Sequence, residues 1–301
     1  MIECIRNIID NCVCAQALGA FLQKFKHRKG KTDVKEFFGI GGYTREPEGF
    51  LSWQHITFVL ILMTTMVALA VWLGLSNRDK SDKQKNKVLI WAAILINTVE
   101  ITKIVSFCIG AQNPFEWIYH LPLFLCSIQL ITIPLAAFTK GRIRDASLDF
   151  VMIFGILGAV LGTIGAAQNY GCYPVLSIDN VASGITHSIS GFASLYIGFA
   201  KMQSLKRKNI FITFSIMGVA AVLAYIANII FDKNYMFLMA GDGTPYDILF
   251  NLVNGHKIFY PVSVVALFVV YICVFYLAYY GIQSAKESSK STQAVEEAEA
   301  I

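Results

Sequence analysis

The chain has 301 residues, of which 55% are hydrophobic and only 15% are charged, and its formal net charge is +5. A soluble domain usually carries about 25% charged residues because its surface faces water, so this composition excludes a soluble globular protein. The basic residues lie in short segments between apolar stretches, a pattern that does not indicate a nucleic-acid partner.

The first 50 residues form a segment rich in Lys and Arg. Apolar residues between Ile5 and Phe25 recur at helical spacing, so we expect this basic amphipathic segment to lie on a membrane surface. It is predicted to be separate from the membrane domain that follows.

Seven stretches are apolar enough and long enough to cross a bilayer, which takes about 20 residues. We predict helices over residues 53–75, 88–109, 117–138, 148–167, 180–199, 209–230 and 258–280. The predicted fold is therefore all-α, a polytopic membrane bundle of seven transmembrane helices over residues 51–283. Residues 284–301 are small and polar and end in acidic residues, so we expect a disordered cytoplasmic tail.

The orientation follows from the loops between the predicted spans. Apart from Lys233 and Lys257, their basic residues lie in the first, third and fifth loops: Arg78, Lys80, Lys83, Lys85, Lys87, Lys140, Arg142, Arg144, Lys201, Lys206, Arg207 and Lys208. The positive-inside rule places these loops in the cytoplasm, with the N-terminus outside and the C-terminus inside a cell membrane. The basic first 50 residues conflict with this, but most of their charge lies more than about 15 residues from the first span, where the rule weakens.

Polar side chains inside a membrane span are costly, so each is a candidate for function. Asn97, Glu100 and Lys103 in the second span are three residues apart and share a helix face. They belong either to a functional site or to a buried Glu100–Lys103 ion pair. His187 in the fifth span is either a packing residue or the best available general base.

The third predicted span contains His120, Cys126 and Gln129, and we expect Pro122 and Pro134 to bend it. With a rise of about 1.5 Å per residue, Cys126, His187 and Glu100 all lie about 10 to 14 Å below the outer ends of their spans. The outer half of the bilayer is therefore the predicted location of a site. Gly155, Gly158, Gly162 and Gly165 in the fourth span are predicted to allow close helix packing.

The sixth loop carries signals for a short helix from Pro245 to Asn254 that covers the bundle. Thr244 suits the N-cap, proline suits the first helical position and Gly255 suits the end of the helix.

The run from Leu121 to Cys126 reads LPLFLC and resembles the LPLHLC motif of the YwaF-type bacterial integral membrane proteins. That family is similar to a eukaryotic transmembrane cysteine acyltransferase family and, remotely, to the androgen-induced lipid hydrolases. His55, Glu100, His187 and the run Asn234-Tyr235-Met236 also fit, so the resemblance covers about residues 53–280.

The resemblance implies that Cys126 is a nucleophile that carries an acyl group between membrane lipids, with His187 as its base. Glu100 would orient the histidine, and an amide from Asn97 or Gln129 would donate to an oxyanion. The further binding candidates are Lys103, His120, Asn234, Tyr235 and His55, and no cofactor and no metal are predicted.

The chain departs from the motif at Phe124, where the family has a histidine. If that histidine activates the thiol, the activity here would be altered or lost. His120, on the same predicted helix face about one turn nearer the surface, is the candidate substitute.

Two other functions fit the same residues. In a small-solute transporter, Glu100, Lys103 and His187 would be the coupling groups, although the sequence shows no paired broken helices or inverted repeat. In a membrane sensor or binding protein, the same residues would bind a ligand without turnover.

Overall fold

The computed structural model describes residues 34–40, 42–202 and 205–299. Within these ranges the regular elements are helices and no strand occurs, so the predicted all-α class is confirmed there. Most of the predicted basic amphipathic segment lies outside the described residues.

Five helices in the described part are long and apolar enough to cross a membrane. They correspond to the predicted first, second, fourth, sixth and seventh spans: α4 (Trp53–Asn77), α5 (Asp82–Gly110), α7 (Gly141–Thr163), α10 (Ile210–Phe231) and α12 (Phe259–Glu299). Large apolar side chains such as Trp91 on α5 and Ile230 on α10 are exposed on their outer faces. Contiguous exposed apolar surface of this kind requires lipid around it. The chain is therefore a membrane protein.

Helix α9 (Ile178–Phe199) has 22 residues, and it packs against α4, α5 and α7. Its buried positions are mostly small or polar, including Gly184, Ser190, Gly191 and Ser194. A helix surrounded by protein does not need the continuous apolar surface that lipid demands. This explains why α9 reads as the least apolar of the predicted spans.

The third predicted span is not a continuous helix. The structure has a 3-10 helix, η1 (Glu116–His120), then non-helical residues 121–128, and then the ten-residue α6 (Gln129–Phe138). Leu121 is extended, with φ −59° and ψ 142°, because a residue before proline is pushed out of the helical region. Pro122 therefore breaks the segment, whereas the sequence predicted only a bend.

The last predicted span and the tail form one helix, because α12 continues to Glu299. Residues 284–299, which we expected to be a disordered tail, continue this helix. Their Ala, Glu, Gln and Lys residues favour helix, and extending an existing helix avoids the cost of nucleation. The short helix of the sixth loop is present as α11 (Asp247–Leu252), and Oγ1 of Thr244 accepts the N–H of Tyr246 at 3.3 Å.

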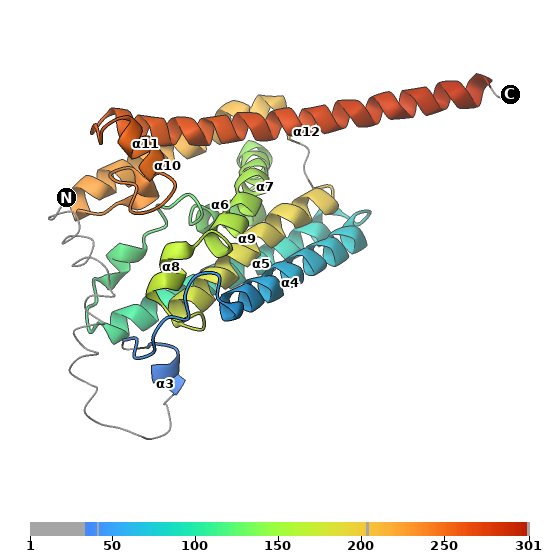
Figure 1. Cartoon of the computed structure of the whole chain (residues 1–301). Helices are drawn as coiled ribbons and strands as arrows, with labels where there is room; N and C mark the ends of the chain where they lie inside the picture. The colour runs from blue at the N-terminus through green and yellow to red at the C-terminus, as the bar shows by residue number, and fades with distance from the viewer. Residues whose placement is uncertain (1–33, 41, 203–204, 300–301) are drawn as a thin grey trace.

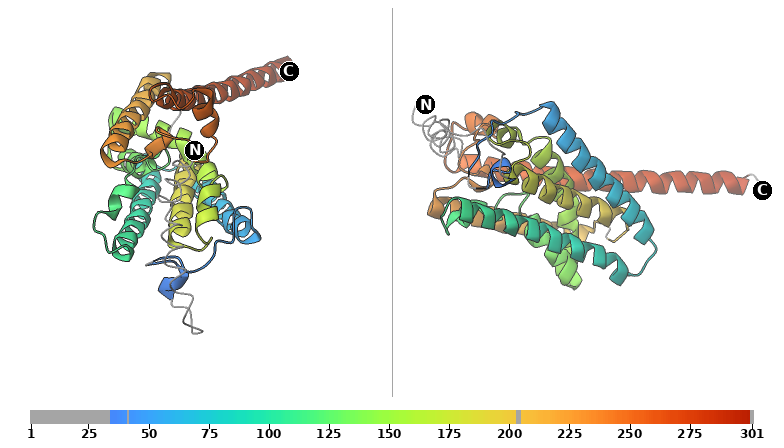
Figure 2. Two further views of the ribbon diagram at one scale, coloured as in Figure 1. Left: turned by 60° about the vertical axis from the view of Figure 1, so that its left-hand side comes forward. Right: turned by 90° about the horizontal axis from the view of Figure 1, so that it is seen from below.

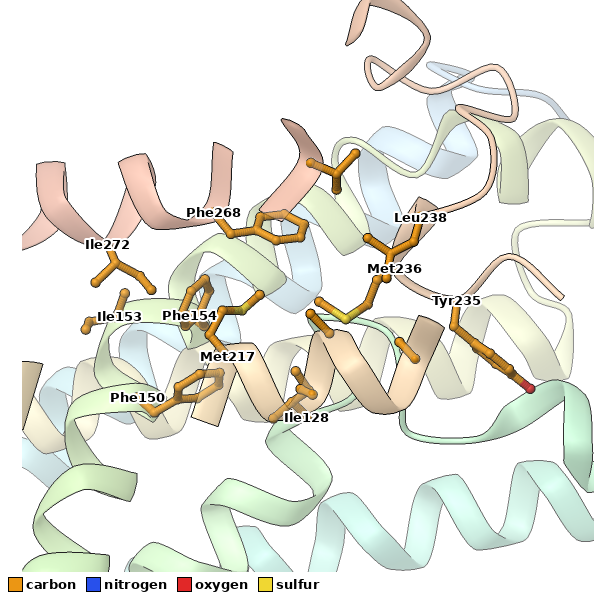
Figure 3. Packing of buried hydrophobic residues seen from close by; sticks show 14 of the residues in the cluster. Ile128, Phe150, Ile153, Phe154, Met217, Tyr235, Met236, Leu238, Phe268 and Ile272 are labelled. Atoms are coloured by element: carbon orange, nitrogen blue, oxygen red, sulfur yellow. The ribbon is translucent and has the colours of Figure 1, made fainter. Parts of the chain in front are cut away.

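The helices form two packed groups with a shared seam (Figures 1 and 2). One buried apolar cluster joins α5, α6, α7 and α9, and a second joins α7, α10, α12 and η3 (Tyr235–Phe237). Figure 3 shows the second cluster, with Phe154, Met217 and Phe268 among its members. Residues 121–128 pack against this cluster and lead directly into α6 of the first. The non-helical segment therefore lies at the seam.

The connections gather at two ends of the molecule. At one end the hydroxyl of Tyr196 donates to the carbonyl of Lys85 at 3.0 Å, and Lys206 pairs with Asp145 at 3.2 Å. This end holds the basic first, third and fifth loops. At the other end the N–H of Val175 donates to Glu48 at 2.7 Å. This second end holds α3 (Val34–Phe37), α8 (Ala167–Cys172) and the connection into α9.

Candidate functional site

Cys126 lies in the non-helical segment immediately before α6. Its carbonyl accepts the N–H of Gln129 at 3.3 Å, so the first turn of α6 begins at the cysteine. Its sulfur lies 3.9 Å from Oγ of Ser127 and also interacts with the backbone N–H groups of Cys126 and Ser127.

His187 approaches Cys126 across a glycine face of α7. A Cβ placed on Gly158 would lie 3.6 Å from Cβ of Cys126 and 3.9 Å from Nδ1 of His187. A Cβ on Gly162 would lie only 2.2 Å from Cε1 and Nε2 of the same imidazole. Cβ of Cys126 and the imidazole of His187 therefore border the same small space, which exists because α7 carries glycine there.

Lys103 is the charged centre of this region. Its Nζ lies 2.7 Å from Oε1 of Glu100, and both side chains are almost buried. The ammonium also acts electrostatically on four other groups: His120, Cys126, Asp179 and His187. Of the three residues that the sequence placed at similar depth, Cys126 and His187 lie near each other beside Gly158. The structure also shows the Glu100–Lys103 ion pair, which was one of the two predicted alternatives.

The two amide candidates differ. Nδ2 of Asn97 donates to the carbonyls of Ala93 and Leu130 at 3.0 and 3.2 Å, so this side chain ties α5 to α6. Gln129 is fully buried, and its Oε1 accepts the hydroxyl of Thr132 at 3.1 Å. Its Nε2 has no hydrogen-bond partner among the described residues. Only Gln129 retains an amide donor for another molecule.

His120 and Phe124 occupy different sides of the segment. The ring of His120 stacks on Phe107, with 4.9 Å between the ring centroids. The ring of Phe124 contacts Tyr235 and Phe237 at 5.5 and 5.7 Å between centroids. Because residues 121–128 are not helical, the helix face predicted for His120 and Phe124 does not exist. The aromatic residue at the motif position faces η3.

His55 lies at the start of α4. Its Nδ1 accepts the N–H of Leu51 at 3.1 Å, so its Nε2 carries the proton and donates to the carbonyl of Thr163 at 3.3 Å. The ring also lies against Tyr170, with 3.9 Å between centroids. These contacts make His55 a tie between α4 and the end of α7.

Asn234 and Tyr235 shape the turn after α10. Asn234 accepts the N–H of Met239 at 2.8 Å and donates to Asp242 at 2.6 Å. Asn228 binds both the N–H and the carbonyl of Tyr235, and the hydroxyl of Tyr235 donates to the carbonyl of Ile118. This network fixes η3 against η1.

Three neighbours of the site were not predicted from the sequence. Asp179 interacts electrostatically with Lys103 and Glu100, and it was missed because it lies just outside the predicted fifth span. Tyr246, in the loop that covers the bundle, interacts with Cys126. Ser127 was read as part of a helix, where its hydroxyl would have faced away from the neighbouring thiol.

Comparison with protein families gives one match: the model of the TMEM164 family matches residues 50–279. The match begins just before α4 and ends within α12, so it contains every residue of the candidate site. Comparison with curated proteins and with solved structures found no match.

Proposed function

Because the chain belongs to the TMEM164 family, a family of transmembrane proteins, we propose that it is a lipid acyltransferase or lipid hydrolase of the cell membrane, with membrane lipids as its partners. The observation that carries the proposal is that Cys126 and His187 both lie within 4 Å of one point above Gly158. A thiol beside an imidazole is the arrangement that activates cysteine nucleophiles.

The proposed reaction begins at an ester of a phospholipid. Nδ1 of His187 takes the thiol proton, the sulfur attacks the ester carbonyl carbon, and the carbonyl electron pair moves to oxygen. As the carbonyl re-forms, its bond to the glycerol oxygen breaks and that oxygen takes the proton from His187. A lysophospholipid leaves, and the acyl group remains on Cys126 as a thioester. The hydroxyl of a second lipid, or water, then attacks the thioester by the same steps and restores the thiol.

Two groups are suited to the negative charge that develops on the carbonyl oxygen. Nε2 of Gln129 is a buried donor without a partner among the described residues, and the Ser127 hydroxyl is next to the sulfur. Donors already in place are worth about 2.7 to 4 kcal/mol each in comparable sites. Glu100 acts on this centre through its ion pair with Lys103.

The same proposal includes seven spans, with the N-terminus outside and the C-terminus in the cytoplasm. It adds α9 and the broken segment 117–138 to the five long apolar helices. Non-helical backbone is tolerated at membrane depth where protein covers it, and residues 121–128 pack against α7, η3 and α10 residues. The site then lies in the outer half of the bilayer.

To test the proposal, the purified protein is incubated in phospholipid nanodiscs, the reaction is quenched in acid, and the mass of the intact protein is measured. Wild type is expected to carry one acyl group that hydroxylamine removes. Cys126→Ala should lack this adduct, while Cys273→Ala, at an exposed position on α12, should keep it. Absence of the adduct from wild type, or its persistence in Cys126→Ala, would overturn the proposal. Solute uptake abolished by Glu100→Gln but not by Cys126→Ala would instead support the transporter alternative.

A further inference from the structure

The two sides of Cys126 differ in chemistry. One side holds the ion pair of Glu100 and Lys103 together with Asp179. The other side holds η3 and its neighbours, and it is apolar. We propose that the acyl chain of the substrate binds on the η3 side, against Tyr235, Met236 and Phe237, while the phosphate of the headgroup lies on the Lys103 side. This inference rests on the proposed function and assigns the direction in which the lipid binds.

The apolar side is built from η3 and the non-helical segment 121–128 that bears the cysteine. Phe124 contacts Tyr235 and Phe237, and Phe237 stacks on Tyr246 with 5.2 Å between centroids. Met236 is 1% exposed and lies in the cluster with Ile128, two residues after Cys126. Figure 3 shows Met236 and Leu238 within the cluster beside Met217 and Phe268, with the hydroxyl end of Tyr235 pointing out of it. An acyl chain entering here meets only apolar surface.

The backbone of η3 marks it as more than packing. Met236 and Phe237 both have φ 56°, a left-handed conformation that costs about 1 to 2 kcal/mol per residue for side chains other than glycine. Two consecutive residues of this kind persist only where the surroundings hold them, and such positions concentrate at ligand-binding sites. Here the holding groups are Asn228, Asn234 and the bond from Tyr235 to Ile118.

Met236 is suited to make room for a chain. Methionine is unbranched and flexible, and it re-packs around irregular apolar groups at low cost. The side chain can therefore turn away from Cys126 while the pinned backbone of η3 stays in place. Tryptophan at this position would be both larger and more rigid, so it would narrow the space left for a chain.

On the other side, Lys103 is suited to a phosphate. Its ammonium has three donors, of which Glu100 occupies one. Lys103 lies on the same face of α5 as Asn97, which bonds to the carbonyl of Leu130 in α6, so a phosphate bound to the ammonium lies on the α5 side of the segment that bears Cys126. Of the two parts of the lipid, Lys103 contacts the headgroup and not the acyl chain. Its replacement should therefore change how much lipid reacts and leave the choice of acyl chain unchanged.

The experiment offers nanodiscs containing phospholipids that differ only in acyl-chain length and reads the chain lengths of the Cys126 adduct by mass. Met236→Trp is expected to shift the ratio of long to short adducts by about tenfold toward short chains. Met239→Trp, at an exposed position of the same turn, should leave the ratio unchanged. Lys103→Met should lower the total adduct without moving the ratio.

Photolabelling keeps the inference testable if a variant fails to fold or no adduct forms. Wild-type protein is illuminated with a phospholipid carrying a diazirine at the end of its chain, or in its headgroup. The chain probe should label buried Met236 as well as lipid-exposed Ile230, and the headgroup probe should label α5 around Lys103. Labelling of Met236 by the headgroup probe, or chain labelling confined to exposed positions, would overturn the inference. An adduct missing from wild type with correct labelling would count against the proposed function alone.

Discussion

The imidazole of His187 occupies the space that a side chain on Gly162 would need, because a Cβ there would lie 2.2 Å from two of its ring atoms. Two turns earlier in α7, Gly155 faces the carbonyl of Ser190, which would lie 2.5 Å from a Cβ. These glycines let α7 and α9 pack closely, and they also set where the imidazole lies relative to Cys126.

Gly162→Ala is therefore expected to displace His187 from the thiol. Loss of a positioned general base lowers rates by about 100-fold or more, so the acyl adduct should form that much more slowly. The matched control is Gly218→Ala on α10, where nothing lies within 4 Å of the added Cβ. Thermal unfolding in detergent would first establish that both variants are folded. Equal rates of adduct formation in the two folded variants would then contradict the assigned role of the glycine.

Gly158→Ala is expected to behave differently. The new methyl would be in ordinary contact with Cys126 and His187, at 3.6 and 3.9 Å, so the fold should tolerate it. It would fill the space between Cβ of Cys126 and the imidazole, which the proposed proton transfer and acyl transfer require. Melting temperature should stay close to wild type while alkylation of Cys126 by iodoacetamide slows. Unchanged alkylation would show that the two groups do not work through this space.

Much of the site could be predicted from spacing and depth. The interval of three residues placed Glu100 and Lys103 on one helix face, and the structure shows them as an ion pair. Counting residues from the span ends put Glu100, Cys126 and His187 at similar depth. In the structure Lys103 forms an ion pair with Glu100 and acts electrostatically on Cys126 and His187. Glycine spacing on α7 predicted close packing, although not that Gly162 would accommodate an imidazole.

The rest depends on contacts between segments far apart in the sequence. A break at Pro122 instead of a bend leaves backbone groups that need partners, and one of them, the carbonyl of Ile118, is bound by Tyr235 from the loop after α10. No local pattern reveals that pairing. Asp179 lies outside a predicted span and Tyr246 lies in a predicted cover, so neither could be assigned to the site without knowing how the ends of α5, α9 and α11 meet.

The end of the molecule with the basic loops should contribute stability without affecting the site. Nδ2 of Asn209 donates to Oδ2 of Asp149 at 2.7 Å, and both side chains are fully buried between α7 and α10. Asn209→Ala should lower the free energy of unfolding by about 1.5 to 3 kcal/mol, as expected for a hydrogen bond to a charged group. Ser215→Ala, exposed on α10, is the control. Acyl adduct formation in the folded fraction should be unchanged, and a loss there would couple this end to the site.

The orientation can be tested at the two ends of one helix. In a background without native cysteines, Asp79→Cys precedes α5 and Ala111→Cys follows it, and both positions are exposed. A membrane-impermeant maleimide added to intact cells should label only the Ala111→Cys variant. After permeabilisation of the cells it should label both variants. The reverse pattern would place the basic loops outside and would move the candidate site to the inner half of the bilayer.

The ion pair of Glu100 and Lys103 should respond to replacement as a unit. Removing one partner leaves an uncompensated charge at membrane depth, so Glu100→Gln or Lys103→Met alone should cost about 3 to 5 kcal/mol. Replacing both removes that penalty, and the double variant should unfold at a higher temperature than either single variant. Its acyl adduct should still form slowly, because the ammonium near Cys126 and His187 is gone. Additive losses of stability in the double-mutant cycle would mean that the two charges do not stabilise each other.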